Sequence, residues 1–238
     1  MKNVITLKSF FFAAGILFIL VSCECYDDPG IVTSETRELA EFDALKIESV
    51  GKVNIYSAEE YAIRIRTHEN ITEDIITSVV DNELTIRLTG NHRRINTLEF
   101  DVFVPYLQRI EQNDVAKISC LDGFTSETLT IIQNDVGDIT IHNLIVQNLD
   151  VTMNDVGDVE LSGMAEDINA TLDGVGDLHL FELHSKNAVI TLEGTGDIEV
   201  SASEFLHIDL SGIGSVYYKG SPTISVTNTG IGKVVNVN

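Results

Sequence analysis

The chain has 238 residues and a formal net charge of −22, with 37 acidic residues against 15 lysines and arginines. Hydrophobic residues make up 44% of it, which is enough for a buried core and excludes intrinsic disorder. So acidic a chain argues against nucleic acid as a partner, because phosphate binding requires a basic surface. Tryptophan is absent, so aromatic platforms for stacking bases or sugars are scarce.

The first segment in chain order has the features of an export signal. Two lysines precede an apolar run over 10–21, which is short for a bilayer span. The run ends in Leu-Val-Ser-Cys at Cys23, and this resembles a bacterial lipobox. We therefore predict a signal peptide over 1–22 and a lipid anchor on Cys23; an ordinary secretory signal is the alternative. The predicted location is the cell envelope, with the chain held to the outer-membrane bilayer at its periplasmic or cell-surface face.

Residues 23–37 lack apolar periodicity and are predicted to form a polar tether between the anchor and the folded domain, which we place at 38–238. Cys25 lies in this tether and Cys120 stands alone in an apolar column, so the sequence contains no disulfide framework and no metal-binding C-x-x-C pair. The fold is therefore expected to depend on packing alone.

An internal repeat of about 20 residues organises residues 108–238. Residues 133–139 read QNDVGDI and residues 153–159 read MNDVGDV, and weaker copies occur before and after them. One glycine or alanine marks each copy: Ala116, Gly137, Gly157, Gly176, Gly196, Gly214 and Gly232.

Apolar residues recur at fixed positions around this marker and are separated by single polar residues, as in β-strands. The position directly before it holds Val115, Val136, Val156, Val175, Thr195, Ile213 and Ile231. Repeats of this length without helical periodicity predict an all-β fold, a right-handed single-stranded parallel β-helix (β-solenoid) of about seven coils. Stacking of the coils supplies its core.

Residues 57–107 interrupt the repeat with three alternating runs that predict antiparallel strands with one wet face, and residues 71–78 suggest a short helix. We predict that this insertion caps the N-terminal end of the solenoid. Its basic residues are candidates for a stripe that binds an anionic glycan or a lipid headgroup, unless local acids neutralise them. They are Arg64, Arg66, Arg87, Arg93 and Arg94.

Several segments resemble the family called "putative auto-transporter adhesin, head GIN domain", and the resemblance covers about residues 38–238. The matching segments are Phe42–Tyr56, Glu83–Leu88, Val104–Ile110, the serial G-D-I coils and Tyr218–Pro222. The resemblance implies a β-helical envelope protein, secreted or lipid-anchored, and brings no catalytic residues. The sequence departs from the usual Ser-Gly before the repeat glycine, where three coils carry Asn-Asp, at 113–114, 134–135 and 154–155.

Two columns of aspartates are the sharpest candidate site. The first holds Asp138, Asp158, Asp177 and Asp197, and the second holds Asp114, Asp135 and Asp155. Carboxylates stacked about 4.8 Å apart repel one another by about 0.9 kcal/mol per pair in water. A row of Ca²⁺ ions would relieve this repulsion, since calcium prefers oxygen ligands. The alternative is structural, because Asn, Asp and Gly suit tight turns.

No catalytic residue is predicted, because the solenoid contains few cations, its histidines are scattered over the repeat, and no nucleophile or zinc motif is present. The predicted function is a non-enzymatic, adhesin-like binding or scaffold module that contacts a glycan or an envelope protein. The alternatives are an accessory domain of envelope-stress signalling and a polysaccharide-active enzyme. Unpaired strand edges near 236–238 also predict association with a second copy.

Overall fold

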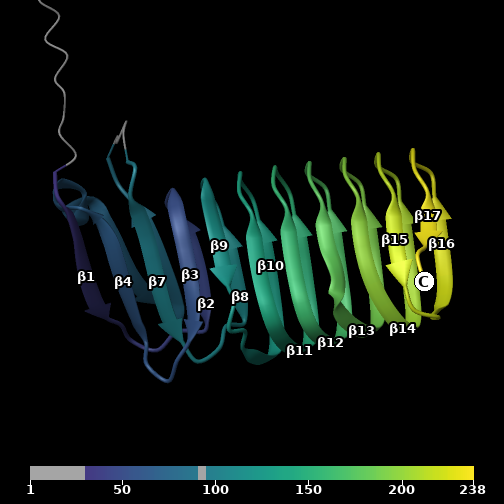
Figure 1. The fold of residues 1–238 in the computed structure, drawn as a ribbon, viewed down its shortest axis with the longest axis horizontal. Coiled ribbons are helices and arrows are strands. Elements are labelled where there is room, and N and C mark those ends of the chain that lie inside the picture. Colours follow the sequence, from purple (N-terminus) through teal and green to yellow (C-terminus); the bar gives the residue numbers. More distant parts are fainter. Residues whose placement is uncertain (1–29, 91–94) are drawn as a thin grey trace, which may run out of the picture.

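The computed structural model describes residues 30–90 and 95–238, which form a β-solenoid of about six turns with additional strands at its N-terminal end (Figure 1). The predicted signal peptide at 1–22, the anchor Cys23, the first part of the tether and the two arginines at 93 and 94 lie outside the described residues. No helix within the described part is long and apolar enough to cross a membrane.

The repeat coils stack in parallel, each on the equivalent strands of the coil before it. Ile139, Val159, Leu178, Ile198 and Val216 are successive partners, which confirms the alignment on the repeat glycine. The strands of this part are β8 (Arg109–Gln112), β9 (Ala116–Cys120), β10 (Thr125–Gln133), β11 (Ile139–Met153), β12 (Val159–Leu172), β13 (Leu178–Leu192), β14 (Ile198–Leu210), β15 (Val216–Lys219), β16 (Thr223–Asn228) and β17 (Val234–Asn236).

The core consists of aliphatic columns that run along the solenoid. One column contains Ile110, Ile131, Val151, Ala170, Ile190 and Ile208, and all six are buried. Cys120 is buried in another column, and desolvation there raises the pKa of its thiol to about 11. The thiol therefore stays protonated at neutral pH and acts as a small core side chain.

The N-terminal insertion is only partly antiparallel, which corrects the prediction for 57–107. β6 (Glu83–Leu88) and β7 (Leu98–Val104) stack in parallel on β2 (Ala44–Glu48) and β3 (Gly51–Ser57), which in turn stack on β8 and β9. The insertion therefore adds one more turn. The physical reason is core continuity: Leu84 lies beside Leu45 and Phe100 beside Val53, and all four are buried.

Antiparallel strands close this end beyond the added turn. β4 (Ala62–His68) pairs with β7, and β5 (Ile75–Val80) pairs with β6. β1 (Val32–Glu38) pairs antiparallel with β4 at the edge (Figure 1). The predicted cap is thus present as β1, β4 and β5.

Two further expectations differ from the structure. The helical segment is a 3₁₀ helix over Glu69–Asp74, and the following Ile-Ile-Thr-Ser belongs to β5, because its backbone pairs with β6. The predicted tether over 23–37 is also too long, since β1 takes up its last residues. The sequence of β1 has no apolar alternation, and the strand forms because the edge of β4 offers backbone partners.

Candidate functional site

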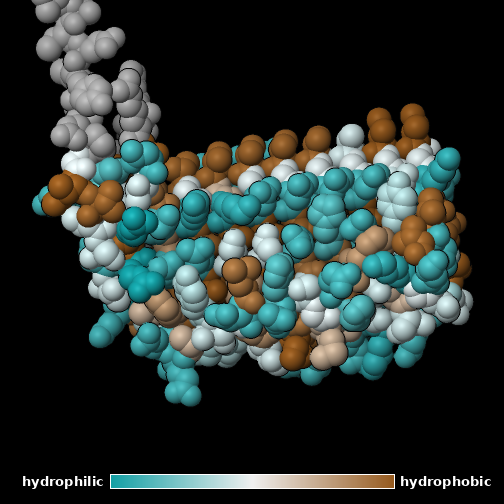
Figure 2. All heavy atoms as spheres, in the orientation of Figure 1, coloured by the Kyte–Doolittle hydropathy of each residue, from teal (hydrophilic) through white to brown (hydrophobic). Residues whose placement is uncertain are grey.

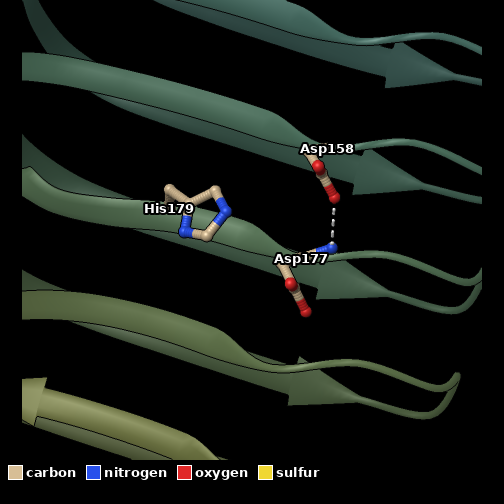
Figure 3. A group of neighbouring side chains, drawn as sticks. All are labelled: Asp158, Asp177 and His179. Atoms are coloured by element: carbon tan, nitrogen blue, oxygen red, sulfur yellow. Dashed lines mark hydrogen bonds between the residues drawn. The ribbon is translucent and has the colours of Figure 1, made fainter.

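The first aspartate column is a hydrogen-bonded ladder at the coil turns. The Asp158 carboxylate accepts a hydrogen bond from the backbone N–H of Asp177 at 3.0 Å (Figure 3). The Asp177 carboxylate accepts one from the backbone N–H of Asp197 at 2.7 Å. The same contact occurs in two other coils: Oδ1 of Asp138 accepts a hydrogen bond from the N–H of Asp158, and Oδ1 of Asp197 accepts one from the N–H of Ser215. Each carboxylate therefore ties one coil to the next, which is a structural use of the column that the sequence alone did not specify.

The second column is built differently. Oδ1 of Asp114 accepts a hydrogen bond from the following backbone N–H, and Oδ1 of Asp135 does the same, both at 2.7 Å. Beside this column the asparagines form their own ladder, in which Asn134 donates to Asn113 and Asn154 donates to Asn134. The Asn-Asp pairs thus order the turns through local and coil-to-coil hydrogen bonds.

One group of potential metal ligands occurs within the described ranges: Asp158, Asp177 and His179, whose ligand atoms lie within 4.8 Å of one another. None of the second-column aspartates joins it. His179 also contacts Glu199 at 3.1 Å through Nδ1. A mixed nitrogen and oxygen set of this kind suits a transition metal better than calcium.

Two buried glutamines, Gln112 and Gln133, lie near the first turns and were not predicted from the sequence. Nε2 of Gln133 donates to the carbonyl oxygens of Gly137 at 2.9 Å and Val156 at 3.1 Å, and Gln112 makes equivalent bonds one coil earlier. They occupy the core column that later holds Met153 and leucines. The signal that could have found them was the polar interruption of an otherwise apolar column.

The residues directly before the repeat glycine form an exposed row along one long edge, which we call the apolar ridge. Its members are Val115, Val136, Val156, Val175, Thr195, Ile213 and Ile231. Between 42% and 73% of each aliphatic member is exposed. Parallel bridges link consecutive members from Val156 to Ile231. Figure 2 shows hydrophobic side chains in a row along the upper edge, where the turns of Figure 1 protrude.

Acidic groups flank the apolar ridge on both sides in sequence. The first aspartate column follows it by two residues, and the second column directly precedes it in three coils. A groove of about 490 Å³ runs beside the ridge, and it is lined by Val156, Val175 and Ile213 together with Asp155, Asp173 and Glu193. The edge therefore combines exposed aliphatic groups with negative charge over several coils.

A second groove, of about 710 Å³, gathers histidines that are scattered in the sequence. His142, His179 and His184 line it. Nε2 of His142 lies 3.6 Å from a carboxylate oxygen of Glu160, and His179 contacts Glu199 as described above. The three histidines occupy different positions relative to the repeat glycine, so the periodicity did not predict that they line one groove. The strand register also shifts beside them, between β11 and β12 and between β12 and β13.

The three described arginines of the predicted basic stripe are each paired with a local acid. Arg64 binds Asp101 at 2.7 Å, Arg66 binds Glu99 at 2.9 Å, and Arg87 binds Glu48. The hydrogen bonds from Lys46 and Arg87 lower the pKa of Glu48. These ion pairs favour the alternative interpretation, in which the arginines belong to a solvated surface and do not bind an anionic ligand. None of the described arginines of this surface lacks an acidic partner.

Comparison with known proteins identifies the fold and the family. A family model described as "Putative auto-transporter adhesin, head GIN domain" matches residues 41–222. The chain belongs to the head GIN domain family. A crystal structure from Bacteroides fragilis NCTC 9343, described as a "putative adhesin", has 27% identity and a TM-score of 0.83. The match covers 87% of this chain and 97% of that one.

More distant structures share the fold of this head GIN domain. A "putative lipid binding protein" from Parabacteroides distasonis ATCC 8503 has 17% identity and a TM-score of 0.67, over 88% of this chain and 98% of that one. A "putative adhesin" from Parabacteroides merdae ATCC 43184 has 19% identity and a TM-score of 0.62, over 88% and 97%. No curated protein matches the chain.

Proposed function

We propose that this head GIN domain is a non-enzymatic, adhesin-like binding module of the cell envelope, and that the apolar ridge is its contact surface. The observation that carries the proposal is the row of exposed aliphatic side chains repeated from coil to coil. Scattered apolar residues are normal on a protein surface, whereas a contiguous row with polar flanks is typical of an interaction site. Membership in an adhesin family supports the same role.

The chemistry of the ridge favours a protein partner. Aliphatic side chains bury apolar surface, while sugars are usually held by aromatic platforms and polar groups, and the chain has no tryptophan. The aspartates beside the ridge favour cationic groups on the partner. The predicted ligand is therefore a protein segment that presents apolar residues together with lysine or arginine.

A binding array of extracellular-matrix proteins, envelope proteins and glycans tests this proposal. We expect retention on protein spots that weakens as salt rises, because the acidic flanks attract cationic groups through screened charges. Replacing Val156, Val175 and Ile213 by serine should weaken that retention at least about tenfold. This corresponds to a loss of about 1.4 kcal/mol of binding free energy.

The matched control replaces three exposed apolar residues away from the ridge by serine: Ile145, Met164 and Val189. They lie on β11, β12 and β13, so both triple variants alter the solenoid to a similar extent. The control should bind as the original protein does. Protein binding that survives loss of the ridge residues, or retention on glycans alone, would contradict the proposal.

Lipid anchoring of Cys23 in the outer membrane fits an envelope adhesin, because the tethered domain would stay at the surface where it acts. Mass spectrometry of the mature N-terminus tests this part of the proposal. An accessory role in envelope-stress signalling remains the alternative, and gene neighbourhood distinguishes it. A glycan-degradation screen tests the polysaccharide-active enzyme.

Cation binding by the aspartate columns is a separate prediction. If calcium binds there, the midpoint temperature of unfolding should be higher in millimolar CaCl₂ than in EDTA, because a ligand of the folded state stabilises it. Zinc should be measured beside calcium, since His179 belongs to the only ligand group found in the described chain. Identical melting curves with calcium, zinc and EDTA would contradict the prediction.

A further inference from the structure

The last rung of the solenoid leaves the end of the core uncovered. Ile224 and Val226 of β16 lie beside Leu206 and Ile208 of β14, in the same inward-facing columns. The two β14 residues are fully buried, whereas Ile224 is 39% and Val226 is 44% exposed. The columns are continuous, so the exposure arises because no described strand covers β16.

The backbone of β16 is open on the same side. β16 pairs with β14, and just beyond it the N–H of Thr229 donates to the carbonyl of Leu210, also in β14. Backbone groups alternate in direction along a strand, so the N–H groups of Asn228 and Val226 face away from β14. Within the described chain no strand pairs with them. An edge of this kind is a template for another strand.

Charge distinguishes this end from the rest of the molecule. The sequence contains no aspartate or glutamate after Asp209, and its only charged side chains beyond that point are Lys219 and Lys233. Two copies of a chain with a net charge of −22 repel one another over most of their surfaces. β16 itself adds no charge to this repulsion, since it reads Thr-Ile-Ser-Val-Thr-Asn, and the nearest acid in register is Asp209 of β14, beside Thr227.

The opposite end has two edge strands, β1 and β5, and β1 carries the usual protection against strand pairing. β1 contains Glu35, Arg37 and Glu38, and charged residues on an edge strand discourage association. Arg37 also reaches across the end to donate to the carbonyl of Ile75 at 2.9 Å and to Thr77 at 3.1 Å. β5 is itself uncharged, but it is contacted by Arg37, whereas β16 contains no charged residue and receives no hydrogen bond from one within the described chain.

We propose that the C-terminal rung is a dimerisation surface, on which β16 pairs antiparallel with β16 of a second copy. A two-fold axis makes such a contact self-complementary and closed, so it yields a dimer and no filament. Pairing satisfies the outward backbone groups and covers Ile224 and Val226. A second copy fits because the strand is uncharged, is rich in β-branched residues and presents Ile224 and Val226 on its inward face. The rung lies beyond residue 222, where the family match ends.

Disulfide trapping in membranes of cells that express the full chain tests the contact. Single cysteines are introduced as Ile224→Cys, Ser225→Cys, Val226→Cys and Thr227→Cys, and mild oxidation follows. A two-fold antiparallel pairing places one position opposite itself at a distance that a disulfide can span. We expect a disulfide-linked dimer that peaks at one position, at least about fivefold above Val189→Cys, an exposed site on β13. The native cysteines are common to all variants.

Sedimentation of the purified full chain in detergent provides the second readout. The original protein should have the mass of a dimer, and Val226→Lys should reduce it to a monomer with an unchanged circular dichroism spectrum. Val189→Lys should remain dimeric. A monomeric original protein, or trapping no stronger at β16 than at position 189, overturns the proposal. Oligomers larger than a dimer would instead indicate head-to-tail stacking and also overturn it.

Discussion

Replacing Gly176 by alanine is expected to lower the free energy of unfolding by roughly 3–5 kcal/mol, because two independent penalties coincide at this turn. The φ angle of Gly176 is +144°, which L side chains rarely adopt. A Cβ at this position would also overlap the carbonyl oxygen of Gly157 in the coil before. That carbonyl belongs to backbone and cannot move aside without separating the coils.

The turn around Gly176 also carries hydrogen bonds that join three coils. The N–H of Gly157 donates to the carbonyl of Val175 at 3.1 Å, and the N–H of Gly176 donates to that of Thr195 at 3.0 Å. Separation of the coils would break both. Chemical denaturation followed by circular dichroism measures the loss.

Val175→Ala is the control for Gly176→Ala, because Val175 is the neighbouring ridge residue and is exposed. It should change the free energy of unfolding by less than about 0.5 kcal/mol. Equal stability of Gly176→Ala and Val175→Ala would show that close approach of the turns does not hold the coils together. Ala116 occupies the same repeat position in an earlier coil. Its φ angle is not positive, which explains why this position tolerates a Cβ.

Two substitutions of Asp177 are expected to show whether the first aspartate column stabilises the fold through its hydrogen-bond acceptors or through its negative charge. Asp177→Ala removes the acceptor of the Asp197 N–H, which lies 2.7 Å away in a partly buried position. The loss of a hydrogen bond to a charged group should lower the free energy of unfolding by about 1–3 kcal/mol. Asp177→Asn retains an acceptor oxygen and removes one charge from the column, so it should be close to the original protein in stability.

Asp155→Ala supplies the matched control for the Asp177 variants. Asp155 is a turn aspartate of the second column, and its side chain has no hydrogen bond to the next coil among those found in the described chain. It should therefore change stability by less than about 0.5 kcal/mol. If Asp177→Asn is as destabilised as Asp177→Ala, the carboxylate charge matters more than the acceptor, and the interpretation of the column as a hydrogen-bonded ladder is wrong.

The repeat alone was enough to predict most of the solenoid from the sequence. Each coil repeats the inward positions of Ile131 and Ile139, so the periodicity of about 20 residues leads directly to stacked parallel strands. The N-terminal end was harder, because β6 and β7 look like ordinary amphipathic strands. Only their packing on Leu45 and Val53 reveals that they continue the solenoid.

The surface was less predictable than the core. The ridge residues and the inward columns are both aliphatic and both recur in every coil. The sequence therefore did not show which of the two sets faces solvent. In the folded chain Val156 and Val175 are exposed, whereas Val159 and Leu178, three residues further on, face the core and are buried. The groove of His142, His179 and His184 brings together three different positions of the repeat, which periodicity does not predict.

The sequence by itself determined the repeat, the parallel stacking, the aliphatic core and the concentration of acidic residues at the turns, because these follow from composition and spacing that recur in every coil. The tertiary structure alone decided that the aspartates bind the backbone of the next coil, that the valines before the glycines face solvent, and that β16 leaves the core open. These features depend on the direction of each backbone group relative to its neighbouring coil, and spacing along a single chain does not specify that direction.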